Sequence, residues 1–105
     1  MKFSKATPGG GVSEVFKGFE SISYSGETTI KAAGESLFLY AIKEKSTNGC
    51  YLEFYEGETL IGQAQLFPSE TYVFNHWIDP AIEIRTKRIT STAPDPIGYL
   101  YKGVV

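Results

Sequence analysis

The sequence predicts an all-β protein, an antiparallel β-sandwich of about seven or eight short strands. Apolar and polar residues alternate with a period of two through much of residues 36–67, the pattern of strands that bury one face. Glycine- and proline-containing turns recur at short intervals, as they do in jelly-roll and immunoglobulin-like sandwiches. The sequence leaves open which of these two topologies is present. No stretch shows the strand–helix alternation of a nucleotide-binding fold.

The composition fits one domain with one core. The chain has 105 residues, of which 42% are apolar and 14% aromatic. The net charge is −2. Nucleic acid is therefore not expected as a partner, because phosphate binding needs an excess of lysine and arginine. The single cysteine, Cys50, excludes an internal disulfide and is expected to be a small buried hydrophobe.

The apolar runs are too short for export or membrane insertion. The opening segment "MKFSKATPGGG" lacks the apolar run of a signal peptide. The longest such run in the chain, Leu37–Ile42, is far shorter than the ~20 residues of a membrane helix. We therefore expect synthesis in a cytosol and no membrane partner.

Residues 1–11 are expected to form a flexible N-terminal arm, and residues 12–105 a single β-sandwich domain. Pro8 followed by three glycines disfavours regular structure. The arm is either a frayed terminus or a segment that orders on a neighbouring subunit, and the sequence does not decide between them. Residues 12–22 carry apolar residues at helical spacing, but Gly18 and the β-rich surroundings favour extended structure.

The strands of the domain are expected between clear turn signals. They are predicted at residues 21–25, 28–32, 36–43, 50–55, 60–66, 71–75, 81–87 and 97–102. The segment 36–43 is apolar on both faces, which indicates a central strand covered on two sides. The predicted core consists of Phe38, Leu39, Leu52, Phe54, Leu66 and Ile84.

Groups able to carry chemistry are few. His76 is the only histidine and lies near Asp79 in "NHWIDP", but no nucleophile elbow accompanies them, and both are expected to bond local backbone in a turn. One histidine and one cysteine cannot build a zinc site of the usual kind, and no phosphate-binding glycine motif is present. No pair of carboxylates stands out for glycoside hydrolysis. We expect no enzymatic activity, no cofactor and no metal.

Tyrosine is in excess, with seven in the chain. Tyr51 and Tyr55 lie opposite the expected core face, and Tyr99 and Tyr101 share one face of the last strand; such side chains suit protein contacts and sugar stacking. The one basic cluster is "EIRTKR", read either as an ordinary outward sheet face or as a patch that meets an acidic neighbour. The candidate interface residues are Phe3, Lys5, Tyr51, Tyr55, Trp77, Arg85, Lys87, Arg88, Tyr99 and Tyr101.

One stretch resembles a known family. In "TIKAAGESLFLYAIKEKSTNGCYLEFYEGETLIGQAQL", an Ala-Gly turn precedes an apolar strand, a glycine turn follows, and Tyr-Glu-Gly leads into Leu-Ile-Gly. With the later Phe74 and Ile82–Ile84, the pattern covers about 70 residues and resembles small β-sandwich structural proteins of tailed bacteriophages. The N-terminal 25 residues do not share it, and "NHWIDP" stands where a simpler glycine-rich turn is expected.

The resemblance implies a non-enzymatic structural virion protein. The role it favours is that of a capsid decoration or cement protein, and the second is that of a tail or neck component. Such a protein acts as a homo-oligomer, in first place a trimer, bound to the major capsid protein or another virion protein. It is made in the cytoplasm of the bacterial host and ends on the capsid surface. The alternative is a carbohydrate- or receptor-binding sandwich that uses exposed Trp77 and tyrosines.

Overall fold

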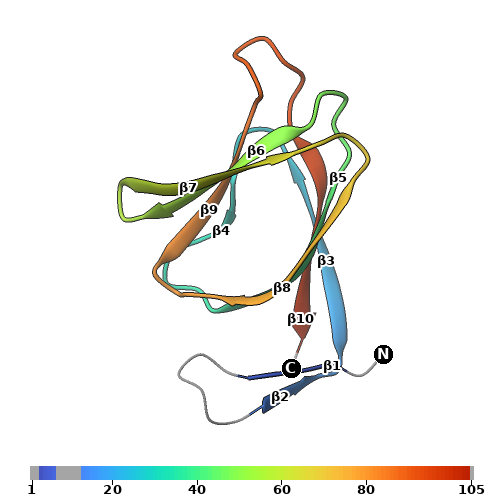
Figure 1. Ribbon diagram of the computed structural model, residues 1–105, viewed down its shortest axis with the longest axis vertical. Helices are drawn as coiled ribbons and strands as arrows, with labels where there is room; N and C mark the ends of the chain where they lie inside the picture. The colour runs from blue at the N-terminus through green and yellow to red at the C-terminus, as the bar shows by residue number, and fades with distance from the viewer. Residues whose placement is uncertain (1–2, 7–12, 105) are drawn as a thin grey trace.

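A computed structural model describes residues 3–6 and 13–104 of the chain, with side chains from residue 17 onward. The described part is all-β (Figure 1). Its strands are β1 (Phe3–Ala6), β2 (Ser13–Phe16), β3 (Gly18–Ser25), β4 (Thr29–Lys31), β5 (Leu37–Glu44), β6 (Cys50–Glu56), β7 (Thr59–Leu66), β8 (Thr71–Ile78), β9 (Ile82–Lys87) and β10 (Ile97–Val104). Among these residues no helix is long and apolar enough to cross a membrane.

Eight of the strands form two four-stranded antiparallel sheets that pack as a sandwich. The first sheet has the order β3-β10-β5-β8 and the second β4-β9-β6-β7. Counted from β3, the first sheet holds the first, eighth, third and sixth strands, and the second holds the second, seventh, fourth and fifth. This is the strand order of a jelly roll, so the antiparallel sandwich predicted from sequence is confirmed and the immunoglobulin-like alternative is not followed.

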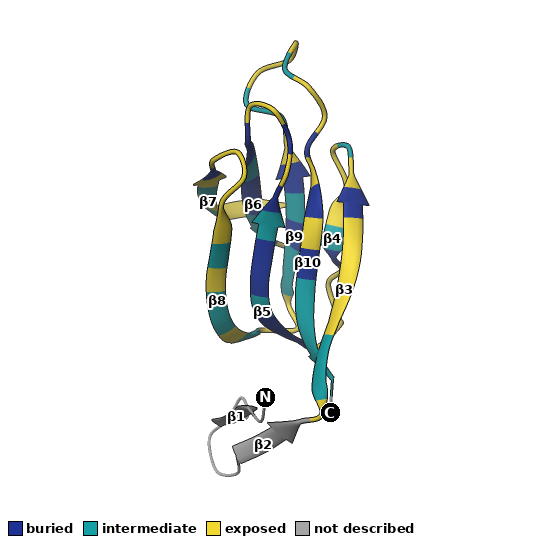
Figure 2. Ribbon diagram, turned by 90° about the vertical axis from the view of Figure 1, so that its right-hand side faces the viewer, coloured by how far each residue is buried: buried dark blue, intermediate teal, exposed yellow. Residues whose placement is uncertain are grey.

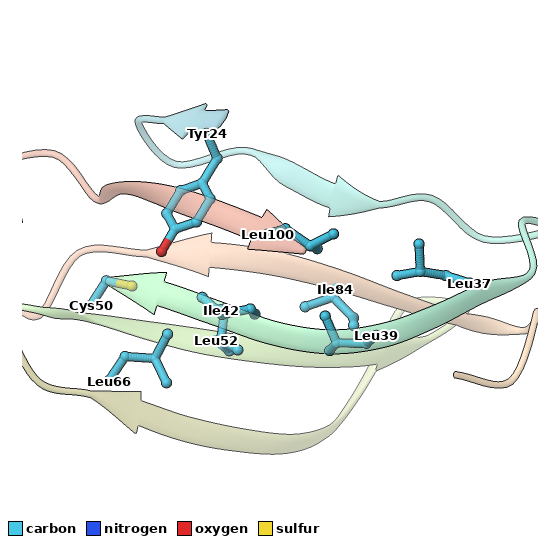
Figure 3. Close-up of a cluster of buried hydrophobic side chains, with 9 residues drawn as sticks. All are labelled: Tyr24, Leu37, Leu39, Ile42, Cys50, Leu52, Leu66, Ile84 and Leu100. Atoms are coloured by element: carbon cyan, nitrogen blue, oxygen red, sulfur yellow. The ribbon is translucent and has the colours of Figure 1, made fainter. Parts of the chain in front are cut away.

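The core lies between the two sheets. Its buried side chains are Tyr24, Leu37, Leu39, Ile42, Cys50, Leu52, Leu66, Ile84 and Leu100 (Figure 3). Of the six predicted core residues, Leu39, Leu52, Leu66 and Ile84 belong to this cluster, and Phe38 is buried outside it. Phe54 is partly exposed but packs against the cluster.

Strand β5 is covered on both faces, as its apolar character predicts. It lies between β10 and β8 in the sheet, and Leu39 and Ile42 enter the core. The strict alternation breaks at a bulge between Leu39 and Ala41, opposite Asn75, whose φ is 56°. Phe38 and Ala41, which do not belong to the core cluster, are also buried, so the outer face of β5 is covered as well.

Two expected turns have the predicted backbone. Gly49, at the end of "STNG", has φ 76°, and a Cβ there would collide with the carbonyl of Leu66. Gly57 has φ 62° in the β6–β7 turn. Both values lie in the left-handed region that glycine adopts without strain. Gly57 therefore fits the β6–β7 hairpin turn, and Gly49 the connection by which the chain passes from β5 in one sheet to β6 in the other.

The N-terminal region differs from the expected arm. Residues 3–6 form strand β1, which pairs with β2 in a separate two-stranded antiparallel sheet. Figure 1 places this hairpin beyond the ends of β3 and β10. Residues 12–22 were expected to be extended, and residues 13–16 and 18–22 are strand, with a bend at Lys17 between them. Pro8 and the three glycines after it lie outside the described residues.

Candidate interaction surfaces

The four candidate tyrosines separate onto two surfaces. Tyr51 and Tyr55 are on β6, in the second sheet, whereas Tyr99 and Tyr101 are on β10, in the first. In each pair the side chains point away from the core that lies between the sheets, because their strand neighbours Leu52 and Leu100 are core residues. The two pairs therefore occupy opposite outer faces of the sandwich.

The first surface also contains most of the basic cluster. Strand β9 pairs with β6 so that Tyr51 lies opposite Lys87, and Tyr55 opposite Glu83. The guanidinium carbon of Arg85 lies 4.0 Å from the centre of the Tyr55 ring, within the range of a cation–π contact. We call Tyr51, Tyr55, Arg85 and Lys87 the tyrosine–arginine face. The sequence suggested these residues separately, and the β6–β9 pairing brings them together.

Hydrogen bonds hold the tyrosine–arginine face in place. Arg85 donates from Nε to Glu83 Oε2 at 2.9 Å and from Nη2 to Oε1 at 3.0 Å. The Tyr55 hydroxyl donates to Glu53 Oε1 at 3.1 Å, and Gln63 Nε2 donates to the other oxygen of that carboxylate at 3.2 Å. Glu53 is only 8% exposed. The face is thus ordered before any partner arrives.

The electrostatics of this face centre on Glu83. Its carboxylate accepts from Arg85 and also from the Thr29 hydroxyl, at 2.8 Å to Oε2. The hydrogen bonds from Arg85, and then the one from Thr29, lower the pKa of Glu83 to about 2. The same pairing raises the pKa of Arg85. Both groups therefore stay charged at neutral pH, and their charges largely cancel.

Arg88 follows Lys87 in the chain but pairs with carboxylates that do not belong to the tyrosine–arginine face. Its side chain pairs with Glu27 at 3.2 Å and with Asp95. Its backbone N–H donates to Glu27 Oε2 at 2.9 Å. Arg88 therefore ties the loop after β9 to the turn after β3. Because both Arg85 and Arg88 pair with carboxylates, the expected basic patch has little unbalanced positive charge.

The second surface is a shallow groove around Tyr99, on the outer side of β3 and β10. The groove is about 380 Å³ and is lined in part by Ser23, Ser25, Lys45 and Ile97. Lys45 Nζ lies 5.3 Å from the centre of the Tyr99 ring. The Tyr99 and Tyr101 rings are 6.4 Å apart and tilted by 40°. Tyr99 is 36% exposed, so one part of its ring faces solvent.

The remaining candidate interface residues lie elsewhere. Trp77 is on β8 and is half-buried. Its ring packs edge-on against Phe38, with the ring centres 5.6 Å apart, so only part of the ring is accessible for stacking on a ligand. Phe3 and Lys5 belong to β1, and their side chains lie outside the described residues.

The residues considered for catalysis, His76, Asp79 and Cys50, lie in different environments. His76 is exposed and lies in β8 rather than in the expected turn, because the strand continues to Ile78. Asp79 does form the turn, where its Oδ1 accepts from the N–H of Ala81 at 2.8 Å. Cys50 is fully buried, and burial, with the nearby Glu44 carboxylate, raises the pKa of its thiol. The described residues contain no group of three side chains able to hold a metal ion.

Two charged residues with fully buried side chains were not identified from sequence. Lys31 is 1% exposed, and its Nζ donates to the carbonyls of Asp79, Pro80 and Ile82. Glu44 is fully buried, and its Oε1 accepts from the N–H groups of Lys45 and Ser46. The burial of Glu44 could have been predicted from strand alternation, since Glu44 is two residues after Ile42 and so lies on the same, core side of β5. Lys31 gave no such signal.

A scan against protein-family models, a search of curated proteins and a search of solved structures each found no match to the chain.

Proposed function

We propose that this protein is a non-enzymatic structural component of a larger protein assembly, namely a capsid decoration or cement protein of a tailed bacteriophage. The assignment to a phage comes from the resemblance that begins at residues 29–30 and includes Phe74 and Ile82–Ile84. The observation that carries a contact function is the Tyr55–Arg85 stack on the outer face of the second sheet. Tyrosine and arginine, together with tryptophan, are enriched at the energetic centres of protein interfaces.

The stack favours a protein partner over a sugar. One side of the Tyr55 ring is already covered by the Arg85 guanidinium at 4.0 Å, so that side cannot stack on a sugar ring. The double hydrogen bond from Arg85 to Glu83 holds the stack in a single geometry. A partner would then bind side chains that have already lost their rotational freedom, which lowers the entropic cost of association.

In this proposal the protein acts as a homo-oligomer, with a trimer as the order that the resemblance implies. Residues 1–11 make additional contacts with the major capsid protein or another virion protein. Deleting residues 1–11 tests that part. Sedimentation should show an unchanged oligomer, and binding to purified particles should be lost. Unchanged particle binding would rule out the N-terminal segment as an anchor.

Particle fractionation tests the assignment itself. Mass spectrometry of separated heads and tails should find the protein in the head fraction, and its absence from both fractions would contradict the proposal. Co-sedimentation with heads should then show that Tyr55→Ala weakens binding by roughly tenfold or more, as expected for a residue at the centre of an interface. Tyr99→Ala, on the opposite face, is the matched control and should bind normally.

The groove around Tyr99 favours a second candidate, a carbohydrate- or receptor-binding sandwich. It combines a partly exposed aromatic ring with the hydroxyls of Ser23 and Ser25 and the ammonium of Lys45, a combination suited to sugar stacking and hydrogen bonding. On a glycan array, binding that Tyr99→Ala abolishes and Tyr55→Ala preserves would favour this candidate over the structural one.

A further inference from the structure

The two sheets of the sandwich end in four edge strands, and these differ in how well they are protected. Within the described residues, β3 and β8 are the edges of the first sheet, and β4 and β7 those of the second. Figure 2 shows β3 and β4 on one side of the sandwich and β7 and β8 on the other. An edge strand exposes unpaired N–H and C=O groups, which invites pairing with another chain unless the edge is short, bulged or charged.

Three of the four edges are blunted. β4 has three residues, and its register with β9 shifts between Thr29 and Lys31. The pairing of β7 with β6 shifts between Phe54 and Tyr55. The pairing of β8 with β5 shifts opposite Asn75. Bulges twist an edge away from a regular partner and so discourage strand addition.

β3 has none of these protections. It is eight residues long, and its pairing with β10 runs from Gly18 to Ser25 without a register shift. Its sequence, GFESISYS, contains no proline, lysine or arginine, and Glu20 is its one charge. Figure 2 shows most of the strand exposed. By the rules that natural sheets follow, this is the edge open to another strand.

Ile22 marks the same edge as incomplete. It pairs with the buried Leu100 and therefore points to the core side of the sheet, yet it is 41% exposed. A cavity of about 300 Å³ opens beside it, lined in part by Tyr24, Ile30 and Leu100. The short β4 strand leaves this part of the core side of β3 uncovered. An apolar side chain in such a position is completed by an apolar neighbour from outside.

We propose that β3 pairs antiparallel with β3 of a second copy across a two-fold axis at Ile22, so that the two first sheets join into one. In this register Ser21 lies opposite Ser23 of the other copy, and Glu20 opposite Tyr24. The two Ile22 side chains meet at the axis, with their Cβ atoms ~5 Å apart, and cover the mouths of both cavities.

The backbone supports this register. The N–H of Gly26 donates to the Pro96 carbonyl on the β10 side at 2.8 Å. Strand alternation then directs the N–H groups of Ser21, Ser23 and Ser25 outward, where they are available to a new strand. A two-fold axis at Ile22 pairs Ser21 with Ser23, and Phe19 with Ser25, so the outward groups meet one another.

The charges are also complementary. Continued past the strand ends, the register places Lys17 of one copy at the same end as Glu27 of the other, and the two-fold axis repeats this arrangement. Both residues are exposed. Glu27 already pairs with Arg88, but Arg88 also pairs with Asp95, so two carboxylates share one guanidinium there and leave a net negative charge near Lys17. Glu20 meets Tyr24 rather than a second Glu20, so the one charge of the strand is not set against itself. A self-paired edge is therefore favoured over one that binds an unrelated strand.

Solution mass tests the proposal on the purified full chain, independently of any phage particle. Sedimentation equilibrium should give twice the monomer mass of 11.6 kDa. Ile22→Lys places two ammonium groups at the axis and should give a monomer. Val73→Lys is the matched control, because Val73 is an exposed apolar residue on the bulged edge β8, and it should leave the dimer intact.

A cysteine variant tests the register. Ile22→Cys should give a disulfide-linked dimer in mild oxidant such as oxidised glutathione, because the new thiols face each other across the axis and a small movement of the strands brings their Cβ atoms to disulfide distance. Glu20→Cys, exposed on the same strand, should not, because its two copies lie four positions out of register. The native Cys50 is buried and does not compete.

The outcomes separate this proposal from the proposed function. A monomer at ~1 mM, a trimer, a dimer that Ile22→Lys leaves intact, or equal crosslinking of the two cysteine variants would overturn the β3 pairing. A dimer would replace the trimer that the resemblance implies, without testing the assignment to a virion. A dimer that never appears in phage particles would leave the pairing standing and count against the virion role.

Discussion

The Tyr24 ring lies directly over Gly98, its partner in the β3–β10 ladder. A Cβ built on Gly98 would come 2.5 Å from the Tyr24 hydroxyl oxygen and 2.7 Å from Cζ, and closer still to the carbonyl oxygen of Lys43. Gly98 also pairs with Glu44 on its other side, so the glycine leaves room for the tyrosine to extend across β10 towards the buried carboxylate. The close approach of the Tyr24 ring explains why a glycine, Gly98, occupies this position in the inner strand β10.

We expect Gly98→Ala to destabilise the protein by at least ~2 kcal/mol, because the added methyl group meets backbone and a buried ring and neither can move freely. Chemical unfolding in urea measures this loss. Gly62→Ala is the matched control: Gly62 is also in a strand, and a Cβ there would meet only Phe54, at an ordinary 3.9 Å. Equal effects of the two variants would show that the Tyr24–Gly98 packing does not constrain the fold.

The Tyr24 hydroxyl predicts a sensitivity to alkali. Burial, and secondly the charge of Glu44, raises the pKa of Tyr24 above its ordinary value near 10. A group with a raised folded pKa contributes stability that is present below the unfolded pKa and is lost as pH rises above it. The wild-type protein should therefore lose stability above about pH 10, and Tyr24→Phe should lose less over the same interval. Identical pH profiles would contradict this prediction.

Leu52→Ala tests the predicted core. Leu52 is fully buried in the cluster between the sheets, so its truncation should cost roughly 2–5 kcal/mol of unfolding free energy. Leu60→Ala, at a leucine that is 47% exposed on the neighbouring strand, should cost about 1 kcal/mol or less. A loss below ~0.5 kcal/mol for Leu52→Ala would mean that the faces of β6 are assigned the wrong way round.

The local pattern predicted the strands and most of the core, because period-two alternation reports directly which side of a strand is buried. Leu52, Leu66 and Ile84 were found in this way. The topology was not predictable, because it depends on pairings such as Tyr24 with Gly98, which are distant in the sequence. Strand β8 was expected to end at 75 because "NHWIDP" was interpreted as a turn. In the structure the strand continues to Ile78, past Asn75, whose positive φ breaks the alternation on which the prediction relied.

The candidate surfaces were predictable as residues but not as an arrangement. Tyr55 and Arg85 were each identified, but their stacking follows from the β6–β9 register, which the sequence does not reveal. Lys31 was missed because a lysine in an alternating strand normally points to solvent. Its burial depends on carbonyl groups of Asp79 and Pro80 in the β8–β9 turn and of Ile82 at the start of β9, and no local pattern encodes them.

Those carbonyl groups give a further prediction. Lys31→Met keeps the apolar stem but removes the donor to Asp79, Pro80 and Ile82, leaving their carbonyls without this partner, and should cost about 1–3 kcal/mol. Lys43→Met is the matched control, since Lys43 donates to the single carbonyl of Ser69 at the surface, and it should cost less. If both variants unfold at the same urea concentration, the buried ammonium contributes nothing to the turn.

The last prediction concerns acid stability of the tyrosine–arginine face. The hydrogen bonds from Arg85, and then from Thr29, lower the pKa of Glu83 from an ordinary 4.5 to about 2. A group with a depressed folded pKa contributes stability that is present above the unfolded pKa and is lost as pH falls to the folded one. Glu83→Gln should therefore flatten the fall in stability between about pH 4.5 and pH 2. Urea unfolding at a series of pH values measures this fall. Arg85→Gln should flatten the same interval nearly as much, because it removes the larger cause, and Thr29→Val should do so only in part. If all three variants keep the wild-type slope, the contacts around Glu83 form without stabilising the fold.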